Sequence, residues 1–280
     1  MGDRPVLRRG AKVHAVTAYR DGQAGRRSRV PTLRCRVTGI LIAVAVLLGA
    51  TACGVTDSGE RLTVFAAASL TDVFRTLGEE FETAHPGVAV TFSFAGSAHL
   101  AQQLAAGAPA DVVALADTHT MAMVTAHRAI LGEPQVFAHN RLVIAVPAGN
   151  PRRITGLADL TSVRVALCAS QVPCGAAAQT AVRVAGVSLT PASVEPNVRA
   201  ALTRLVLGEV DAALVYGTDV RGRSDVEAIE FPESAAARND YSLAVLADTS
   251  ERALAETFVA FVRSASARAV LTAAGFEASG

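Results

Sequence analysis

The sequence LTVFAAASLTDVFRTL, residues 62–77, decides the expected fold of this chain. Its first part, residues 62–67, is short, apolar and free of proline, which is typical of a buried strand. A helical pattern follows at once, because apolar residues recur at helical spacing over 70–77. Ser69 stands at the junction, where we predict a helix N-cap with Asp72 at the capping-box spacing. A serine there can cap the helix or offer its hydroxyl and the free N–H groups to an anion, and both roles stay open.

The same strand-then-helix unit recurs downstream. Residues 88–94 predict a strand, and Ser97 opens a helix that we expect to end at Gly107. A strand over 111–116 and a helix over 121–130 follow. This alternation predicts an α/β fold with a parallel sheet, in which ligands bind at the carboxyl ends of the strands.

The alternation starts again after a predicted strand over 141–147, which suggests a second α/β domain. The elements predicted for it are a strand over 163–167, helices over 176–185 and 198–207, and a strand over 212–216. We expect residues 241–246 to return as a strand beside 142–146. The last two predicted helices have clear apolar faces and should pack on the first domain; they cover 250–264 and 266–274.

These elements predict two domains preceded by a leader. The expected parts are a leader over 1–53, a tether over 54–61, a first domain over 62–141 plus 247–280, and a second domain over 142–246. Two domains joined by two crossings of the chain predict a hinged clamp, with a ligand cleft between the domains.

The charge of the chain is unevenly distributed. Residues 1–53 hold 10 of the 26 Lys and Arg residues and 2 of the 25 Asp and Glu residues, which gives a net charge of +8. The remainder has a net charge of −7 and contains no lysine. A surface without lysine or a basic run is unsuited to nucleic acid, so we expect no nucleic-acid partner.

The leader has the pattern of an export signal. An apolar run over 37–52 follows the basic residues Arg34 and Arg36, and it ends in small residues before Cys53. This ending resembles a bacterial lipoprotein signal, in which the cysteine is lipidated. We therefore expect an exported protein anchored through Cys53 on the outer face of the cytoplasmic membrane. The alternatives are an uncleaved anchor and an ordinary secretory signal with an incidental cysteine.

Five segments of the chain together resemble the molybdate-binding proteins of bacterial ABC transporters. They are FAAASLTDVF, SFAGSAHLAQQLAAGAPADVVALAD, VPCG, NVRAAL and LVYGTD, and the resemblance extends over residues 62–277. It implies a two-domain periplasmic-binding-protein fold of type II, with an oxyanion held in the interdomain cleft by uncharged donors.

The resemblance also implies which residues bind the oxyanion. Ser69 and Ser97 would each donate through their hydroxyl and backbone N–H. Cys174 and Val198 would donate through backbone N–H groups, and Tyr216 would donate through its phenol. All but Tyr216 fall at or beside a predicted helix start, where free N–H groups and the helix dipole favour an anion.

The chain departs from the family pattern at two positions of the expected site. Cys174 stands where alanine is frequent, which a backbone donor tolerates. Gly96 stands where serine is common, and we expect it to loosen one wall of the site. Because the protein is expected to be exported, we also expect a structural disulfide between Cys168 and Cys174.

A fully deprotonated tetrahedral dianion accepts hydrogen bonds and donates none, so it suits a site made of donors alone. Phosphate usually keeps a proton at neutral pH and requires an acceptor. Asp72 is the nearest candidate for that acceptor, but we assign it to helix capping. Sulfate has the same charge and shape as molybdate, so the sequence leaves it open.

We therefore expect a monomeric, non-enzymatic receptor that needs no cofactor. It would capture molybdate, and tungstate with it, and pass the ion to a membrane permease driven by a cytoplasmic ATPase. The first alternative is a receptor for sulfate or another oxyanion. The second is a secreted α/β hydrolase, which the absence of G-x-S-x-G around Ser69 and Ser97 disfavours. The third is the ligand-sensing half of a transcription regulator, which conflicts with the leader.

Overall fold

The computed structural model of the chain describes residues 59–279. The expected leader and Cys53 lie outside the described residues. The first strand already begins at Glu60, so the last residues of the expected tether belong to the folded part. Within the described residues, none of the helices combines the length and the apolar character that a membrane crossing requires.

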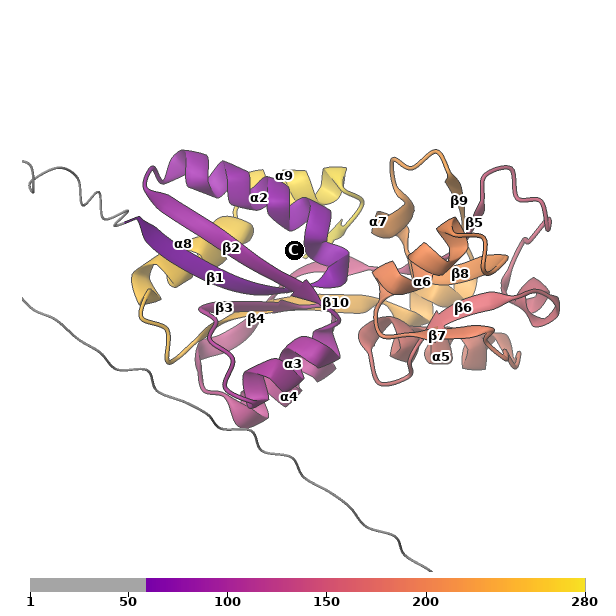
Figure 1. The fold of residues 1–280 in the computed structure, drawn as a ribbon, viewed down its shortest axis with the longest axis horizontal. Helices are drawn as coiled ribbons and strands as arrows, with labels where there is room; N and C mark the ends of the chain where they lie inside the picture. The colour runs from indigo at the N-terminus through magenta and orange to yellow at the C-terminus, as the bar shows by residue number, and fades with distance from the viewer. Residues whose placement is uncertain (1–58, 280) are drawn as a thin grey trace, which may run out of the picture. The chain divides into compact units, whose positions relative to one another are not determined.

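The first of two sheets has six strands in the order β11-β4-β10-β3-β1-β2 (Figure 1). Strand β1 is parallel to β2 and β3, whereas β10 is antiparallel to β3 and β4. Helices α2, α8 and α9 lie on one side of this sheet, and α3 and α4 lie on the other (Figure 1). The bounds of the strands are β1 Glu60–Ala67, β2 Val88–Ala95, β3 Val112–Leu115, β4 Ile130–Asn140, β10 Asn239–Leu246 and β11 Glu277–Ala278. The bounds of the helices are α2 Thr71–Ala84, α3 Ser97–Ala105, α4 Thr118–His127, α8 Arg252–Val262 and α9 Ala265–Ala273.

The apolar face of α2 forms the centre of this half of the core. Phe74 and Phe81 are fully buried, and the ring of Phe81 lies 5.1 Å from that of Phe258 on α8. A side chain at Gly78 would meet the ring of Phe92 at 2.6 Å, so the glycine makes room for that ring. Burial of each such aromatic side chain contributes about 1.5–3 kcal/mol. The expected packing of the last two helices on the first domain is confirmed.

The second sheet has five strands in the order β7-β6-β8-β5-β9. Strands β6, β7 and β8 are mutually parallel along the sheet, and β5 is antiparallel to β8 and β9. The bounds of the strands are β5 Leu142–Pro147, β6 Val165–Cys168, β7 Ser193–Glu195, β8 Ala212–Tyr216 and β9 Val226–Ile229. The helical elements of this part are η2 Leu157–Ser162, α5 Pro173–Ala185, α6 Val198–Val206, α7 Gly217–Val220 and η3 Pro232–Ala237.

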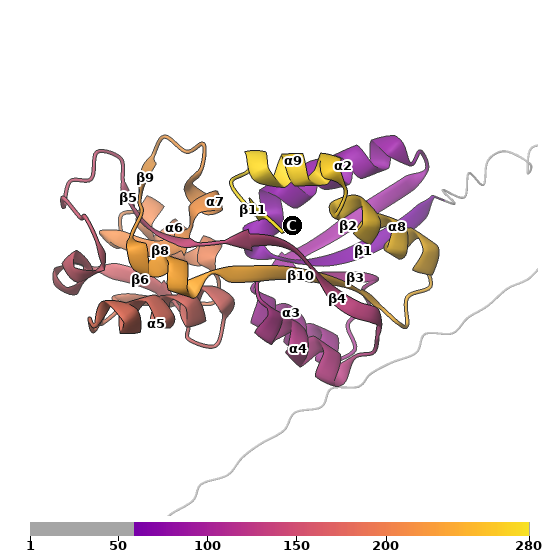
Figure 2. The same ribbon diagram turned by 180° about the vertical axis from the view of Figure 1, so that it is seen from behind.

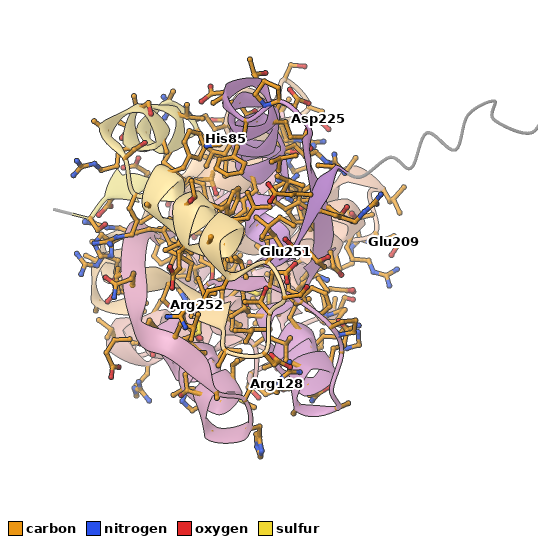
Figure 3. All side chains as sticks on the ribbon, turned by 90° about the vertical axis from the view of Figure 1, so that its left-hand side faces the viewer. His85, Arg128, Glu209, Asp225, Glu251 and Arg252 are labelled. Carbon is orange, nitrogen blue, oxygen red and sulfur yellow. A yellow bond between two sulfur atoms is a disulfide. The ribbon has the colours of Figure 1, made fainter. Side chains whose placement is uncertain are left out.

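The chain crosses between the sheets twice, once between β4 and β5 and once between β9 and β10 (Figure 2). We call residues 59–140 with 239–279 the first lobe and residues 141–238 the second lobe. The expected arrangement of two α/β domains joined by two crossings of the chain is confirmed. Figure 3 views the outer end of the first lobe, where the labelled Arg128 forms an ion pair of 2.6 Å with Asp248.

The expected pairing of residues 241–246 with 142–146 is wrong. Strand β10 pairs with β3 and β4 in the first sheet, while both edges of β5 are occupied by β8 and β9. Strand β4 was not predicted, because Gly132 and Pro134 interrupt its pattern. We therefore propose to assign 239–246 to the first domain.

The expected helix over 121–130 is also displaced. Helix α4 begins at Thr118, because the side chain of Asp117 accepts the N–H of Thr120 at 2.7 Å as an N-cap. It ends at His127, and Ile130 already belongs to β4.

Candidate functional site

A small cavity lies where the carboxyl ends of the strands of both lobes meet. The first lobe contributes residues after β1, β2 and β3, and the second contributes the starts of α5 and α6 and the end of β8. The cavity offers about 20 Å³ of space to the centre of a water-sized sphere. This size suits a ligand of a few atoms. No charged side chain of residues 59–279 lines this cavity. All five residues expected to bind an oxyanion line it: Ser69, Ser97, Cys174, Val198 and Tyr216.

Ser69 is not a helix N-cap, contrary to expectation. It lies within a short 3-10 turn, η1 (Ala68–Leu70), and α2 begins after it without a side-chain cap. Its hydroxyl lies 2.8 Å from the hydroxyl of Tyr241 on β10. Burial raises the pKa of the Tyr241 phenol, so this phenol stays protonated and can donate to Ser69. The single hydrogen of the Ser69 hydroxyl then remains available to the cavity.

Ser97 is held in a similar way. It is the first residue of α3, is 3% exposed, and its hydroxyl oxygen accepts the N–H of Ala116 at 3.1 Å. A hydroxyl that accepts from the protein can direct its own hydrogen toward a ligand. Both serines are therefore positioned as donors by groups behind them. Tyr241 was not among the predicted site residues, because a position on a strand gives no sign of a contact with the distant Ser69.

The two expected donors of the second lobe stand at helix starts. Pro173, the first residue of α5, has no N–H, so the first N–H of that helix belongs to Cys174. Val198 is the first residue of α6, which Asn197 caps by accepting the N–H of Ala200 at 3.0 Å. N–H groups at such positions lack partners within the helix and carry the positive end of its dipole.

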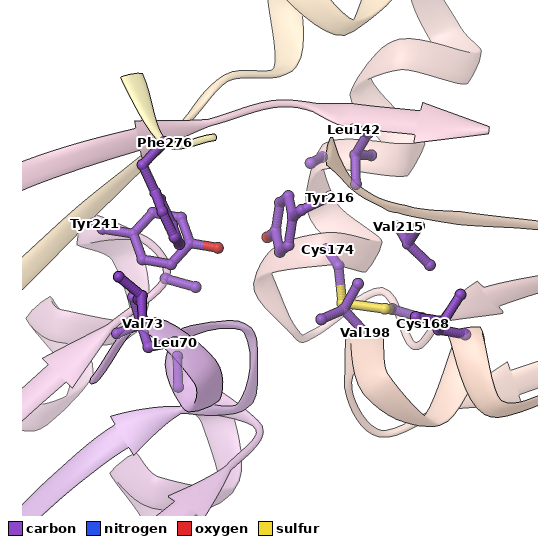
Figure 4. Packing of buried hydrophobic residues seen from close by; sticks show 14 of the residues in the cluster. Leu70, Val73, Leu142, Cys168, Cys174, Val198, Val215, Tyr216, Tyr241 and Phe276 are labelled. Carbon is purple, nitrogen blue, oxygen red and sulfur yellow. A yellow bond between two sulfur atoms is a disulfide. The ribbon is translucent and has the colours of Figure 1, made fainter. Parts of the chain in front are cut away.

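The expected disulfide is confirmed and lies beside this donor loop. It joins Cys168, at the end of β6, to Cys174, and both cysteines are buried (Figure 4). The next residue, Gly175, is packed closely against the backbone, because a side chain there would lie 1.9 Å from the carbonyl oxygen of Ala169. The loop that presents the Cys174 N–H is thus closed by a covalent bond and by close backbone packing.

Tyr216 ends β8 and faces Tyr241 across the two lobes, with ring centroids 6.0 Å apart (Figure 4). It is 1% exposed, and its hydroxyl has no hydrogen-bond partner among the described residues. Burial raises the pKa of this phenol, so it stays a neutral donor. An unpaired buried hydroxyl costs about 1–3 kcal/mol. A bound acceptor in the cavity would remove that cost.

One cation near the cavity is engaged by carboxylates. Arg199, on α6, forms an ion pair with Asp72 of the first lobe and lies 2.9 Å from Asp219 of its own lobe. Asp72 therefore has a different role from the expected helix capping, and its side chain is 70% exposed. The Asp219 side chain is fully buried and accepts the N–H of Tyr216 at 3.1 Å. The guanidinium is thus held by two carboxylates and does not line the cavity.

Burial raises the pKa of Asp219 from 3.8 to about 7, although Arg199 opposes the shift. The folded protein therefore binds more protons than the unfolded chain between these values. The stabilising contribution of this group is fully present below about pH 3.8 and is lost as the pH rises through about 7.

We expect Asp219→Asn to remove this pH dependence. An asparagine oxygen can still accept the N–H of Tyr216, but the side chain does not titrate. We expect the free energy of unfolding, measured with urea, to decrease from pH 4 to pH 7 in the wild type. This decrease should be larger than that of the variant by an amount on the order of 4 kcal/mol. Asp225→Asn is the control, because its hydrogen bond with Arg223 lowers the pKa of Asp225 below this range. Parallel pH profiles of wild type and Asp219→Asn would contradict the assignment.

Comparison with known proteins agrees with this architecture. The family model described as bacterial extracellular solute-binding protein matches residues 62–277. The chain is 42% identical over 248 residues to the molybdate-binding protein ModA of Mycobacterium bovis, covering 86% of this chain and 95% of that protein. It is 31% identical over 236 residues to ModA of Escherichia coli, covering 79% of this chain and 90% of that protein.

Two solved structures have the same fold. The periplasmic molybdate-binding protein of Azotobacter vinelandii has a TM-score of 0.68 at 19% identity, covering 78% of this chain and all of that one. The sulfate-binding protein SubI of Mycobacterium tuberculosis has a TM-score of 0.66 at 21% identity, covering 78% and 87%. The expected resemblance to molybdate-binding proteins is confirmed at the level of sequence. The chain belongs to the family of bacterial extracellular solute-binding proteins.

Proposed function

We propose that this protein is an extracytoplasmic receptor that captures molybdate, and tungstate with it, for an ABC importer. The ion would lie between the lobes and accept hydrogen bonds from Ser69, Ser97, Cys174, Val198 and Tyr216. The observation that carries the proposal is that these five uncharged donors meet in one small cavity, with a buried Tyr216 hydroxyl that has no described partner. The names of the curated relatives support the choice of ion.

The donor set can supply enough free energy without a cation. A hydrogen bond to a charged group contributes about 1.5–3 kcal/mol. Two hydroxyl and backbone pairs, two further N–H groups and one phenol make about seven donors, whereas micromolar binding needs roughly 8 kcal/mol. The excess can offset the costs of association and lobe closure.

The same set disfavours protonated phosphate. Its remaining proton requires an acceptor, but no carboxylate of residues 59–279 lines the cavity. The two carboxylates nearby, Asp72 and Asp219, face Arg199 instead. Sulfate stays the alternative ligand, because its charge and tetrahedral shape suit the same donors.

Titration calorimetry of the full chain with molybdate, tungstate, sulfate and phosphate tests the proposal. We expect molybdate and tungstate to bind with similar affinity, sulfate to bind more weakly, and phosphate weakest. Equal or tighter binding of sulfate would overturn the choice of ion. Absence of binding by all four anions would overturn the proposal that the cavity is an oxyanion site.

Tyr216→Phe is expected to weaken molybdate binding by about ten- to a hundredfold, because it removes one hydrogen bond to a charged partner. The same change deletes a buried hydroxyl that has no described partner, so the free protein should be no less stable. Calorimetry and urea unfolding measure the two effects. Unchanged affinity would remove Tyr216 from the proposed donors.

The receptor would act as a monomer with no cofactor, and the permease and its ATPase would be separate polypeptides. We also propose a lipid anchor at Cys53, on the strength of the signal pattern alone. Metabolic labelling with a radioactive fatty acid would test it: we expect incorporation in the wild type and none in Cys53→Ser. Incorporation in both would contradict lipidation at this residue.

A further inference from the structure

The backbones of the two lobes lie close together at a glycine beside the cavity. Gly96 precedes α3 in the first lobe and lines the cavity. A side-chain carbon built on it would lie 2.6 Å from the carbonyl oxygen of Pro196 and 3.3 Å from the Cβ of Asn197, both in the second lobe. The backbone of Gly96 has φ −60° and ψ 137°, which any residue adopts. Space alone, and not conformation, therefore excludes a side chain here.

We expected Gly96 to loosen one wall of the site. The close contact argues for the opposite effect, because the absent side chain lets the backbones of the two lobes meet. The contact also lies between two proposed donors, because Gly96 precedes Ser97 and Pro196 is two residues before Val198.

The second-lobe side of this contact has little freedom to move. Asn197 caps α6 through Ala200, and the carbonyl of Glu195 accepts the N–H of Ala169 at 2.9 Å. A shift of Pro196 would disturb this cap or the N–H of Val198. An added side chain at position 96 is therefore relieved most easily by separating the lobes.

We infer that Gly96 sets the closest approach of the lobes, and thereby the size of tetrahedral oxyanion that donors of both lobes can reach at once. The inference rests on the proposed function and assigns a specificity-determining position to it. Few Cβ atoms lie closer than about 3.4 Å to another heavy atom, and a methyl group on Gly96 would lie 2.6 Å from the oxygen of Pro196, so it would push the lobes several tenths of an ångström apart. Hydrogen bonds of 2.7–3.2 Å tolerate little of that stretch. A small ion should lose more than a large one, because it cannot span the wider gap.

The test is calorimetry of full-chain Gly96→Ala with molybdate, tungstate and sulfate. We expect molybdate and tungstate to bind about ten- to a hundredfold more weakly than to the wild type, and any sulfate binding to fall by a larger factor. Two matched variants serve as controls. Gly156→Ala adds a methyl group into open space, and Gly78→Ala adds one against Phe92 within the first lobe alone. The first should leave affinity and stability unchanged, and the second should lower stability with affinity within about twofold.

The clash at Gly96 lies between the lobes, so Gly96→Ala should unfold at the same urea concentration as the wild type without anion. Affinities of Gly96→Ala within about twofold of the wild type would overturn the inference. Failure of Gly96→Ala to fold would overturn it as well, because the contact would then serve folding and not closure.

A readout without ligand separates this inference from the proposed function. The chain contains no tryptophan and three tyrosines, two of which face each other across the lobes. Near-ultraviolet circular dichroism of tyrosine therefore reports on their separation. If no anion binds the wild type, the proposed function is wrong. The inference about Gly96 is then tested by the tyrosine spectra of the wild type and the variants without any anion. A changed tyrosine spectrum in Gly96→Ala, but not in Gly156→Ala, would support it, and identical spectra would overturn it.

Discussion

Arg199→Ala is expected to lower the free energy of unfolding by about 1 kcal/mol more at pH 8 than at pH 5. The reason is that the variant leaves the fully buried carboxylate of Asp219 without its cation. The pKa of Asp219 is already about 7 with Arg199 present, so this carboxyl is protonated at pH 5 in both proteins. Removal of the cation raises that pKa further, which confines the penalty to pH values where the wild-type carboxyl is charged.

Urea unfolding at pH 5 and pH 8 measures the difference. Arg252→Ala is the matched control, because Arg252 forms an exposed pair with Glu256 one helical turn away, at 3.0 Å. Such a pair contributes about 0.3–0.5 kcal/mol at either pH. An equal loss for Arg199→Ala at both pH values would show that the guanidinium stabilises the fold by packing and not by its charge.

The double variant Ser69→Ala with Ser97→Ala is expected to weaken molybdate binding by roughly two to four orders of magnitude. Each serine would donate one hydroxyl hydrogen bond to the dianion, and each such bond is worth about 1.5–3 kcal/mol. Both hydroxyls accept from groups behind them, Tyr241 and the N–H of Ala116. The variant therefore also leaves two buried donors unpaired, and its stability should fall by a few kcal/mol.

Calorimetry of the two single variants and the double variant gives the coupling between the serines. A second double variant, Ser170→Ala with Ser250→Ala, removes two exposed hydroxyls and should bind molybdate like the wild type. If the double site variant binds within tenfold of the wild type, the serines line the cavity without holding the ion.

Much of the architecture could be predicted, because it depends on local pattern. The strand ending at Tyr216 was predicted with its observed bounds, since a run of buried apolar residues between turns needs no other information. Strand β4 could not be predicted, because most of its residues are exposed or half-buried and it is held in place by β10, more than 90 residues away in the chain. Pairing over such a distance has no local signature, and the error in placing 241–246 followed from that omission.

The candidate site divides in the same way. Serines, helix starts and the strand end at Tyr216 are features of sequence. The resemblance to molybdate-binding proteins selected five of these residues, and all five line one cavity. The groups that support these residues cannot be recognised in the sequence. Tyr241 bonds to Ser69, and Arg199 pairs with Asp72, and each contact joins residues more than 120 positions apart. The first depends on the packing of β10 within the first lobe, and the second on how the first lobe meets the second.

By itself, the sequence determined that this is an α/β protein of two lobes, because hydrophobic periodicity is encoded locally, and its resemblance to molybdate-binding proteins indicated which uncharged residues to expect at the site. Only the tertiary structure decided which of these residues are held in place by hydrogen bonds to other groups of the protein. It also decided that the lobes meet at a glycine, where a side chain has no room. The physical reason is that a close approach between distant segments depends on a few tenths of an ångström in space, for which the order of residues along the chain has no signal.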